Sequence, residues 1–317
     1  MTCIPAAASL PTITGGALSG ERPRVIVSSD IGGDDPDDIQ SLVHYLLYAD
    51  VLETEGLISS PPGKGRVSDV HGVLDAYADD FEILQGRSAH YPDPDKLRAL
   101  VKQGAIEAAP AAGYSGETEG SRWIVERARA ESDRPLWVLV WGSLTDVAQA
   151  IHDAPDIKPR VRLYSIGSWN TAQDPAARDY LFEHHPDLWW IENDTTFRGM
   201  YLGGDQAGDL DNLGFVEAHV KGRGALGACF WAAKRDIKMG DTPSVLYLLR
   251  GNVSDPTQPS WGGRFVRPRA DRATYWHDDP DPRQRFAERD GAVHVSRWRV
   301  DYLRDWQRRL EALPRRD

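Results

Sequence analysis

Short apolar runs alternate with longer segments of helical period from residue 24 onward. The first run, 25–27, is followed by a loop rich in Gly and Asp and then by apolar residues that recur at helical spacing over 42–47. The pattern predicts strands at 25–27, 52–59, 136–141, 161–166 and 188–192, and helices at 42–47, 67–77, 96–102, 121–130, 144–152, 175–183 and 242–249. This alternation is typical of parallel strands covered by helices, so we expect a single α/β domain with a mostly parallel central sheet.

The last fifth of the chain departs from this rhythm. Residues 251–291 hold many Pro, Asp, Gly and Arg residues with almost no periodicity, which indicates a surface excursion or a wall of an active site. Residues 293–313 carry Arg, Trp and Leu at helical spacing and are expected to pack back onto the body. We expect residues 1–22 to form a flexible arm, which leaves 23–317 as the domain.

Composition limits the partners that the protein can have. The 317 residues include 37 Lys+Arg against 48 Asp+Glu, a net charge of −11, which argues against nucleic acid because its binding depends on Lys and Arg. The longest apolar run is the six residues 136–141, and a run of this length is too short to span a bilayer. Residues 1–20 lack the basic start and apolar centre of a secretory leader, although a trimmed leader would look similar. We expect a cytoplasmic protein without a membrane partner, and a homo-oligomer is possible.

The loop after the first predicted strand is strongly acidic. Five carboxylates fall within nine residues, at Asp30, Asp34, Asp35, Asp37 and Asp38. In an open parallel sheet this loop lies at the carboxyl edge, where ligands bind. One or two acids would cap the following helix, but five repel one another unless a cation lies among them. The loop therefore favours a hard divalent ion with oxygen ligands over simple helix capping.

Two later segments complete a resemblance to a known family. Asp30, Gly32 and a paired Asp-Asp before an apolar helix are similar to the D-x-G-x-D-D signature of the calcium-dependent nucleoside hydrolases. The segment Trp141-Gly142-Ser143-Leu144-Thr145-Asp146 resembles the family's G-P-L-T-N strand end, and Met239-Gly240-Asp241-Thr242-Pro243 resembles its late His-Asp-Pro/Ala segment. The three segments occur in family order. The chain thus resembles the inosine-uridine-preferring type, in its divergent bacterial branch, with a Rossmann-type fold.

The resemblance implies a site. Calcium would be bound by Asp30, Asp38, Asp241 and the backbone carbonyl of Trp141, and Asp37 would lie near the sugar hydroxyls. Asp30 would also be the base for a water molecule at the metal. This assignment matches Asp37-Asp38 to the family's acid pair by distance to the helix, while distance from Asp30 would favour Asp34-Asp35 instead.

The sequence also departs from the family. Ser28 and Gly240 stand where the family commonly has Asp and His, and its Gly-Asn is not evident in Ser59-Ser60-Pro61-Pro62. In the stretch expected to contact the sugar, Asn170 is the best candidate, with Trp169 beside it. The leaving-group partner is unassigned among His71, His219, His277, Trp169, Trp261 and Trp276, of which Trp261 is the best candidate for an aromatic wall.

The function expected from these residues is a calcium-dependent glycoside hydrolase. Its substrate would be a small-molecule nucleoside or another furanoside, cleaved at the N-glycosidic bond. Two alternatives stay open. One is a non-catalytic calcium- and carbohydrate-binding protein on the same fold. The other is a magnesium-dependent phosphohydrolase, which would need a phosphate-binding Lys or Arg near the acidic loop, and the sequence offers no clear one.

Overall fold

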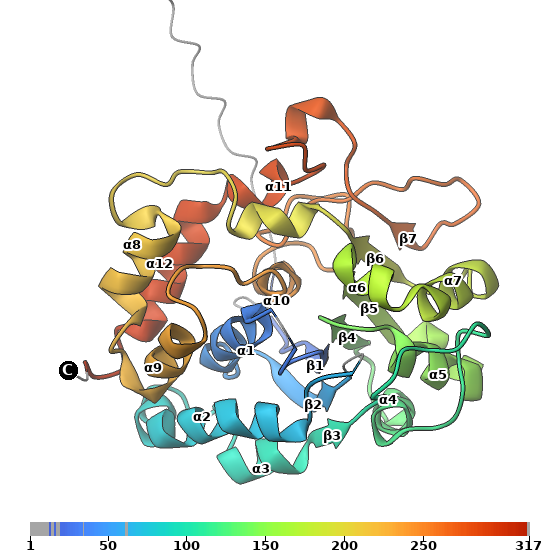
Figure 1. The fold of residues 1–317 in the computed structure, drawn as a ribbon, viewed down its shortest axis with the longest axis horizontal. Coiled ribbons are helices and arrows are strands. Elements are labelled where there is room, and N and C mark those ends of the chain that lie inside the picture. Colours follow the sequence, from blue (N-terminus) through green and yellow to red (C-terminus); the bar gives the residue numbers. More distant parts are fainter. Residues whose placement is uncertain (1–12, 14–15, 17–19, 34, 61–62, 316–317) are drawn as a thin grey trace, which may run out of the picture.

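A seven-stranded parallel sheet forms the centre of the protein in a computed structural model, which describes residues 13, 16, 20–33, 35–60 and 63–315 (Figure 1). The strand order is β3-β2-β1-β4-β5-β6-β7, and every neighbouring pair is parallel. The strands are β1 (Arg24–Ser29), β2 (Glu53–Ser59), β3 (Val101–Gln103), β4 (Leu136–Val140), β5 (Val161–Ile166), β6 (Trp190–Asn193) and β7 (Tyr275–Trp276). The expected single α/β domain with a parallel sheet is therefore confirmed.

Helices cover both faces of the sheet. They are α1 (Asp37–Leu47), α2 (Val67–Arg87), α3 (Pro94–Ala99), α4 (Glu119–Arg129), α5 (Thr145–Asp153), α6 (Trp169–Gln173), α7 (Pro175–His184), α8 (Asn212–Phe215), α9 (Gly224–Ala233), α10 (Thr242–Leu249), α11 (Val293–Ser296) and α12 (Arg299–Leu310). Along the central strand β4, Trp137 and Leu139 join the core that holds α1, α2 and α10, whereas Val138 joins the core under α4, α5 and α7. Successive side chains of a strand point to opposite faces, so both faces of β4 are buried.

The elements differ from the sequence prediction at a few places. The helix predicted at 96–102 is wrong at its end, because α3 stops at Ala99 and Val101–Gln103 forms β3 against β2. The irregular stretch 251–291 contains β7, which pairs with β6 at the sheet edge. Helix α2 continues to Arg87, and the short helices α8 and α9 were not predicted. Residues 293–313 do pack back onto the body, since Trp306 and Leu310 are buried.

Nearly all of the expected N-terminal arm, 1–22, lies outside the described residues, as do Asp34 and 61–62. Within the described part, none of the helices combines the length and apolar character needed to cross a bilayer.

Candidate functional site

A cavity of about 530 Å³ opens at the carboxyl ends of the strands. The strand order reverses between β1 and β4, and at such a reversal the adjoining loops diverge and leave a crevice where ligands bind. The lining residues are Asp30, Gly33, Asp35, Asp37, Asp38, Gly63, Lys64, Trp141, Ile166, Gly167, Trp169, Asn170, Gln173, Phe197, Arg198, Tyr201, Lys238 and Asp241. The volume is in the range of ordinary small-molecule sites.

Four carboxyl groups, called here the acid cluster, meet in this cavity: Asp30, Asp37, Asp38 and Asp241. Carboxylate oxygens of Asp37, Asp38 and Asp241 lie within 4.8 Å of one another. Asp30 lines the same cavity, close enough to Asp38 for its charge to raise the pKa of that carboxyl. Asp241 is therefore brought next to acids about 200 positions earlier in the chain.

The start of α1 places the first part of the acid cluster. Strand β1 ends at Ser29, whose hydroxyl accepts a hydrogen bond from the Ile31 N–H at 3.0 Å and donates one to Asp38. Asp37 and Asp38 occupy the first turn of α1, where carboxylates are favoured by the free N–H groups of the helix start. Asp38 is thus held against the end of β1 by Ser29, nine residues earlier in the chain.

A single buried amide fixes the second part. The Gln40 side chain donates hydrogen bonds to the carbonyls of Lys234 and Asp236, both at 3.0 Å. Its oxygen accepts from the backbone N–H groups of Lys238 at 2.9 Å and Met239 at 3.2 Å. Because the whole amide of Gln40 is used on this loop, α1 and the segment that leads into α10 are locked together, and Asp241 follows directly.

The acid cluster is electrostatically crowded. Burial raises the pKa of Asp38 well above its ordinary value, and the charges of Asp30 and Asp241 raise it further. Burial also raises the pKa of Asp241, with the charges of Asp37 and Asp30 adding to it. For Asp37, burial and the charge of Asp35 raise the pKa to about 7. Each shift has the same cause, which is several carboxylates withdrawn from water with too little positive charge among them.

The donor set fits a hard divalent cation. The Oδ2 atom of Asp241 is buried, and no described residue forms a hydrogen bond with it. A buried polar atom without a partner costs free energy, and a cation between the carboxylates would remove that cost. Carboxylate and carbonyl oxygens are the ligands that Ca²⁺ and Mg²⁺ take, so the residues present fit the group that the resemblance implies.

The structure separates the two candidate Asp pairs. Asp37 and Asp38 face Asp241, whereas Asp35 is exposed and forms an ion pair with Lys238 at 2.5 Å. Gly240, where the resembled family commonly has His, leaves space for this arrangement: a Cβ atom there would lie 2.5 Å from Asp37 Oδ2. The structure thus brings Asp37-Asp38 to the cluster by the helix register on which the prediction was based.

The two further predicted contacts, Trp141 and Asn170, lie in the cavity and bind each other. The Asn170 amide donates to the carbonyl of Trp141 at 2.9 Å and to that of Ile166 at 3.0 Å. The Trp141 carbonyl, which the sequence suggested as a metal ligand, therefore already accepts a hydrogen bond. Gly142 keeps this strand end close to the acidic loop, since a Cβ there would meet the Asp30 nitrogen at 2.7 Å.

The aromatic candidates divide clearly. Trp169 is 69% exposed and lines the cavity, as a stacking platform would. Trp261 does not line it: the side chain is 8% exposed and lies in the hydrophobic core. The irregular sequence around Trp261 suggested an aromatic wall of the cavity. Instead, the backbone N–H of Trp261 donates to the Arg250 carbonyl at the end of α10, and this contact draws the segment inward.

The other leaving-group candidates also lie away from the cavity. His71 is on α2, His219 bonds to Asp209 at 2.5 Å, and Trp276 is buried in the core. Among the described residues that line the cavity there is no histidine.

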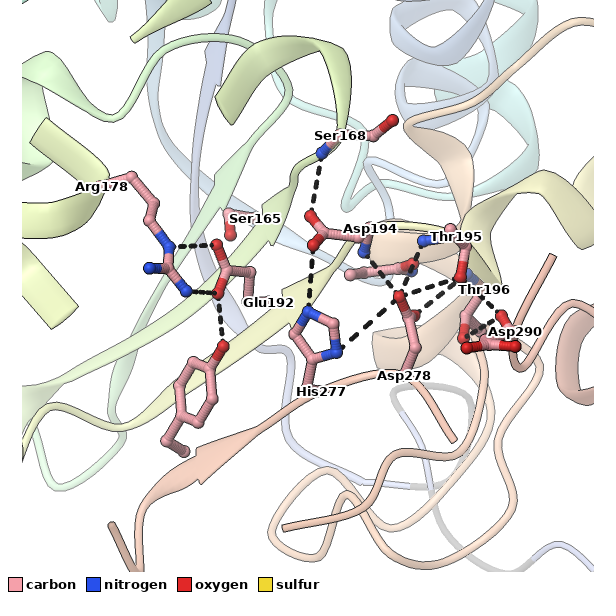
Figure 2. Close-up of polar contacts among 12 residues, drawn as sticks. Ser165, Ser168, Arg178, Glu192, Asp194, Thr195, Thr196, His277, Asp278 and Asp290 are labelled. Atoms are coloured by element: carbon pink, nitrogen blue, oxygen red, sulfur yellow. Dashed lines mark hydrogen bonds and ion pairs between the residues drawn. The ribbon is translucent and has the colours of Figure 1, made fainter. Parts of the chain in front are cut away.

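His277 instead forms a polar network with Asp194 and Asp278 (Figure 2), none of which lines the cavity. Its Nε2 atom lies 3.0 Å from Asp194, which accepts a hydrogen bond from the Ser168 N–H at 2.9 Å. On the other side, Asp278 accepts from the N–H groups at 194, 195 and 196. These three side chains also have oxygen and nitrogen atoms close enough for a metal, but Asp278 already accepts hydrogen bonds from three backbone N–H groups and from the Thr195 hydroxyl. We therefore interpret the network as support for the loop at Ser168.

The cations of the cavity were not predicted from the sequence. Lys64, Arg198 and Lys238 all line it, but none of them belongs to a motif, although Lys238 stands just before the segment 239–243. One signal was present: Arg198 follows β6 by a few residues, and loops after parallel strands form the ligand edge of a sheet. The sequence alone offered no way to choose it among 37 Lys and Arg residues.

The chain matches a known protein family. Residues 24–265 match the family model described as "Cellulose-binding Sde182, nucleoside hydrolase-like domain". Among curated proteins, no sequence matches the chain.

Solved structures resemble it over most of its length. A nucleoside hydrolase-related hypothetical protein from Saccharophagus degradans, associated with carbohydrate metabolism, has a TM-score of 0.72 at 23% identity, covering 92% of this chain and 72% of that one. The type III effector protein XopQ, complexed with adenosine diphosphate ribose, has a TM-score of 0.55 at 13% identity and coverages of 93% and 94%. The inosine-uridine preferring nucleoside hydrolase from Bacillus anthracis has a TM-score of 0.52 at 16% identity and coverages of 90% and 99%. At these identities the likeness shows the fold.

Proposed function

The chain belongs to the Sde182 nucleoside-hydrolase-like domain family, and on that premise we propose that it is a calcium-dependent glycoside hydrolase that cleaves the N-glycosidic bond of a nucleoside or a related furanoside. One observation carries the proposal. Carboxylates from two distant segments converge within 4.8 Å in a cavity at the sheet's reversal point, and a buried oxygen of Asp241 has no partner among the described residues. Without a cation, these buried and mutually repelling carboxylates destabilise the protein, and a bound cation would remove that cost.

Asp30, Asp38 and Asp241 would hold the calcium ion, with Asp37 nearest to the sugar hydroxyls. When bound, calcium would neutralise the crowded carboxylates and grip vicinal hydroxyls of the furanose ring. Trp169, at the open side of the cavity, would cover a face of the ligand. Asn170 would act indirectly, since both of its amide contacts fix the ends of β4 and β5.

Asp30 is the proposed base. In the hydrolysis, the oxygen of a water molecule forms a bond to the anomeric carbon. The glycosidic bond breaks, and its electron pair leaves with the nucleobase or other aglycone. Asp30 takes the proton that the water loses. Burial raises the pKa of Asp30, while the hydrogen bond from Asp38 lowers it. The negative acid cluster also stabilises the positive charge that develops on the sugar ring.

A substrate panel tests the proposal directly. Purine and pyrimidine nucleosides and simple furanosides are incubated with the protein and calcium, and the released reducing sugar is measured with and without a chelator. We expect release from at least one member, lost in chelator, and lost in Asp30→Asn even though that variant still folds. Turnover that continues unchanged in excess chelator would contradict the proposed role of the metal. Calorimetric titration with calcium alone provides a readout that does not depend on activity.

A second candidate is a calcium- and carbohydrate-binding protein without turnover. It is favoured by the absence of a histidine, the commonest proton donor in catalysis, among the described cavity-lining residues. The family description, cellulose-binding, is compatible with it. In this case members of the panel would bind in the presence of calcium, and none would release sugar.

A further inference from the structure

The wall of the cavity contains an arginine with unused hydrogen-bond donors. Arg198 follows β6 on a 3₁₀ turn (Thr196–Met200) and lines the cavity. Its guanidinium donates to the Tyr201 hydroxyl at 3.0 Å and to the Ser168 hydroxyl at 3.2 Å. Its central carbon also lies 4.9 Å from the centroid of the Phe197 ring. All of these partners are neutral.

Arg198 has no negatively charged partner in the described part of the chain: no ion pair joins it to a carboxylate, and its buried Nε has no hydrogen-bond acceptor. A guanidinium offers five N–H donors, of which the two hydrogen bonds use two. The other cation beside Tyr201 differs. Lys238, with its ammonium 5.7 Å from the Tyr201 ring, is neutralised by Asp35 at 2.5 Å. The uncompensated charge of this wall therefore lies on Arg198.

The surroundings hold Arg198 in place before any ligand arrives. Ser168, one of its two acceptors, has a backbone φ of 60°, which is unfavourable for a residue other than glycine. Asp194 stabilises this conformation by accepting the Ser168 N–H, and His277 in turn holds Asp194 (Figure 2). A fixed arginine loses little conformational entropy on binding, so more of its interaction energy is available to a ligand.

We propose that Arg198, supported by Ser168 and Tyr201, binds an oxyanion on the ligand, so that the preferred furanoside carries a phosphate or carboxylate group. This proposal rests on the proposed function for one point, that the furanose ring of the ligand lies at the acid cluster. The anionic group then lies at the wall formed by the loops after β5 and β6. Guanidinium pairs well with either oxyanion, because both present two oxygens to its planar fork.

Binding of ligands without a leaving group tests this step separately from catalysis. Anhydroribitol, a furanose ring with no aglycone, is compared by calorimetry with its phosphate and carboxylate derivatives in the presence of calcium. We expect at least one anionic derivative to bind more tightly than the neutral ring, by roughly tenfold to a hundredfold, the range of a charged hydrogen bond. The derivative that gains identifies phosphate or carboxylate as the source of the oxyanion.

Variants connect the gain to Arg198. Arg198→Met is expected to remove the advantage of the anionic ligand and to leave the affinity for anhydroribitol unchanged, whereas Arg198→Lys should retain part of it. Arg267→Met is the matched control, because that guanidinium also lies over an aromatic ring, 5.3 Å from the Trp276 centroid, but does not line the cavity. Thermal unfolding confirms that each variant is folded.

Three results would overturn the assignment. They are equal affinities for the neutral and anionic ligands, an anionic advantage that survives Arg198→Met, and release of inorganic phosphate from the phosphate derivative, which would place that group at the acid cluster instead. Because the experiment measures binding, it tests the role of Arg198 even if the protein cleaves no member of the nucleoside panel. Failure of the proposed function and failure of this proposal are therefore distinguishable.

Discussion

Replacing His277 by Gln should destabilise the protein at mildly acidic pH and have little effect at high pH. Burial by itself would lower the pKa of His277, but the hydrogen bond to Asp194 and the charges of Asp278 and Asp194 outweigh it and raise the pKa to about 9. Glu192, the other acid that acts on it, is paired with Arg178 at 2.8 Å. The imidazolium form is therefore stabilised in the folded protein.

The size and sign of the effect follow from linkage. A folded-state pKa above the unfolded value contributes stability that is complete below the unfolded pKa and is lost as the pH rises through the folded one. The interval from 6.5 to about 9 corresponds to about 3 kcal/mol at 1.36 kcal/mol per pKa unit. Since the side chains of His277 and Asp194 are 29% and 32% exposed, solvent screening reduces this to about 2 kcal/mol.

Urea unfolding over a pH series measures the effect. The free energy of unfolding of His277→Gln is subtracted from that of the unmodified protein at each pH, which removes the contribution of titrating groups that do not interact with His277. We expect a difference of about 2 kcal/mol near pH 6 that declines toward zero above pH 9. His71→Gln, on α2 away from the network, is the control and should give a small difference at all pH values. A difference for His277→Gln that does not change with pH would refute the reasoning.

Three further changes test the cavity. Asp241→Asn should weaken calcium binding by at least about tenfold in calorimetry. It should also raise the melting temperature of the metal-free protein, because it removes a buried charge that has an oxygen without a partner and that is repelled by the neighbouring carboxylates. Gly240→Ala places a Cβ 2.5 Å from Asp37 Oδ2 and should weaken furanoside binding by displacing that carboxylate, which is proposed to lie nearest to the sugar hydroxyls, whereas Gly72→Ala, with nothing within 4 Å, should leave furanoside binding unchanged. Trp169→Ala should weaken furanoside binding by about 1 kcal/mol. It should alter the free energy of unfolding by less than about 0.5 kcal/mol, since the side chain is 69% exposed.

The sequence predicted the elements whose pattern extends over a full strand or helix. The run 136–141 is apolar for its whole length because both faces of the sheet are covered there, so it stands out without ambiguity. Strands β3 and β7 have three and two residues and carry no periodicity that a reader could detect. They form because β2 and β6 offer free edges for pairing, so they depend on tertiary structure and not on local sequence.

The candidate site divides in the same way. Asp30, Asp37 and Asp38 were found because they are adjacent in the chain, and Asp241 because a short motif precedes its helix. Arg198 has no such local signal, because its importance comes from where β6 ends relative to β5. Trp261 was interpreted wrongly for the opposite reason: its irregular neighbourhood suggested exposure, whereas a backbone contact with Arg250 draws it into the core.

The geometry also separates two tasks between the halves of the sheet. The acid cluster is built by the loop after β1 and the segment before α10, which the Gln40 amide locks together. Arg198 and Ser168 belong to the loops after β6 and β5, and Asp194 and His277 support them from the β7 side. No residue of the first group makes a hydrogen bond to this second group in the described part of the chain, so substitutions on the β5–β7 side can change ligand preference without disturbing the cation. Calcium affinity measured for Arg198→Met should therefore equal that of the unmodified protein, and a parallel loss of both would show that the two halves are coupled.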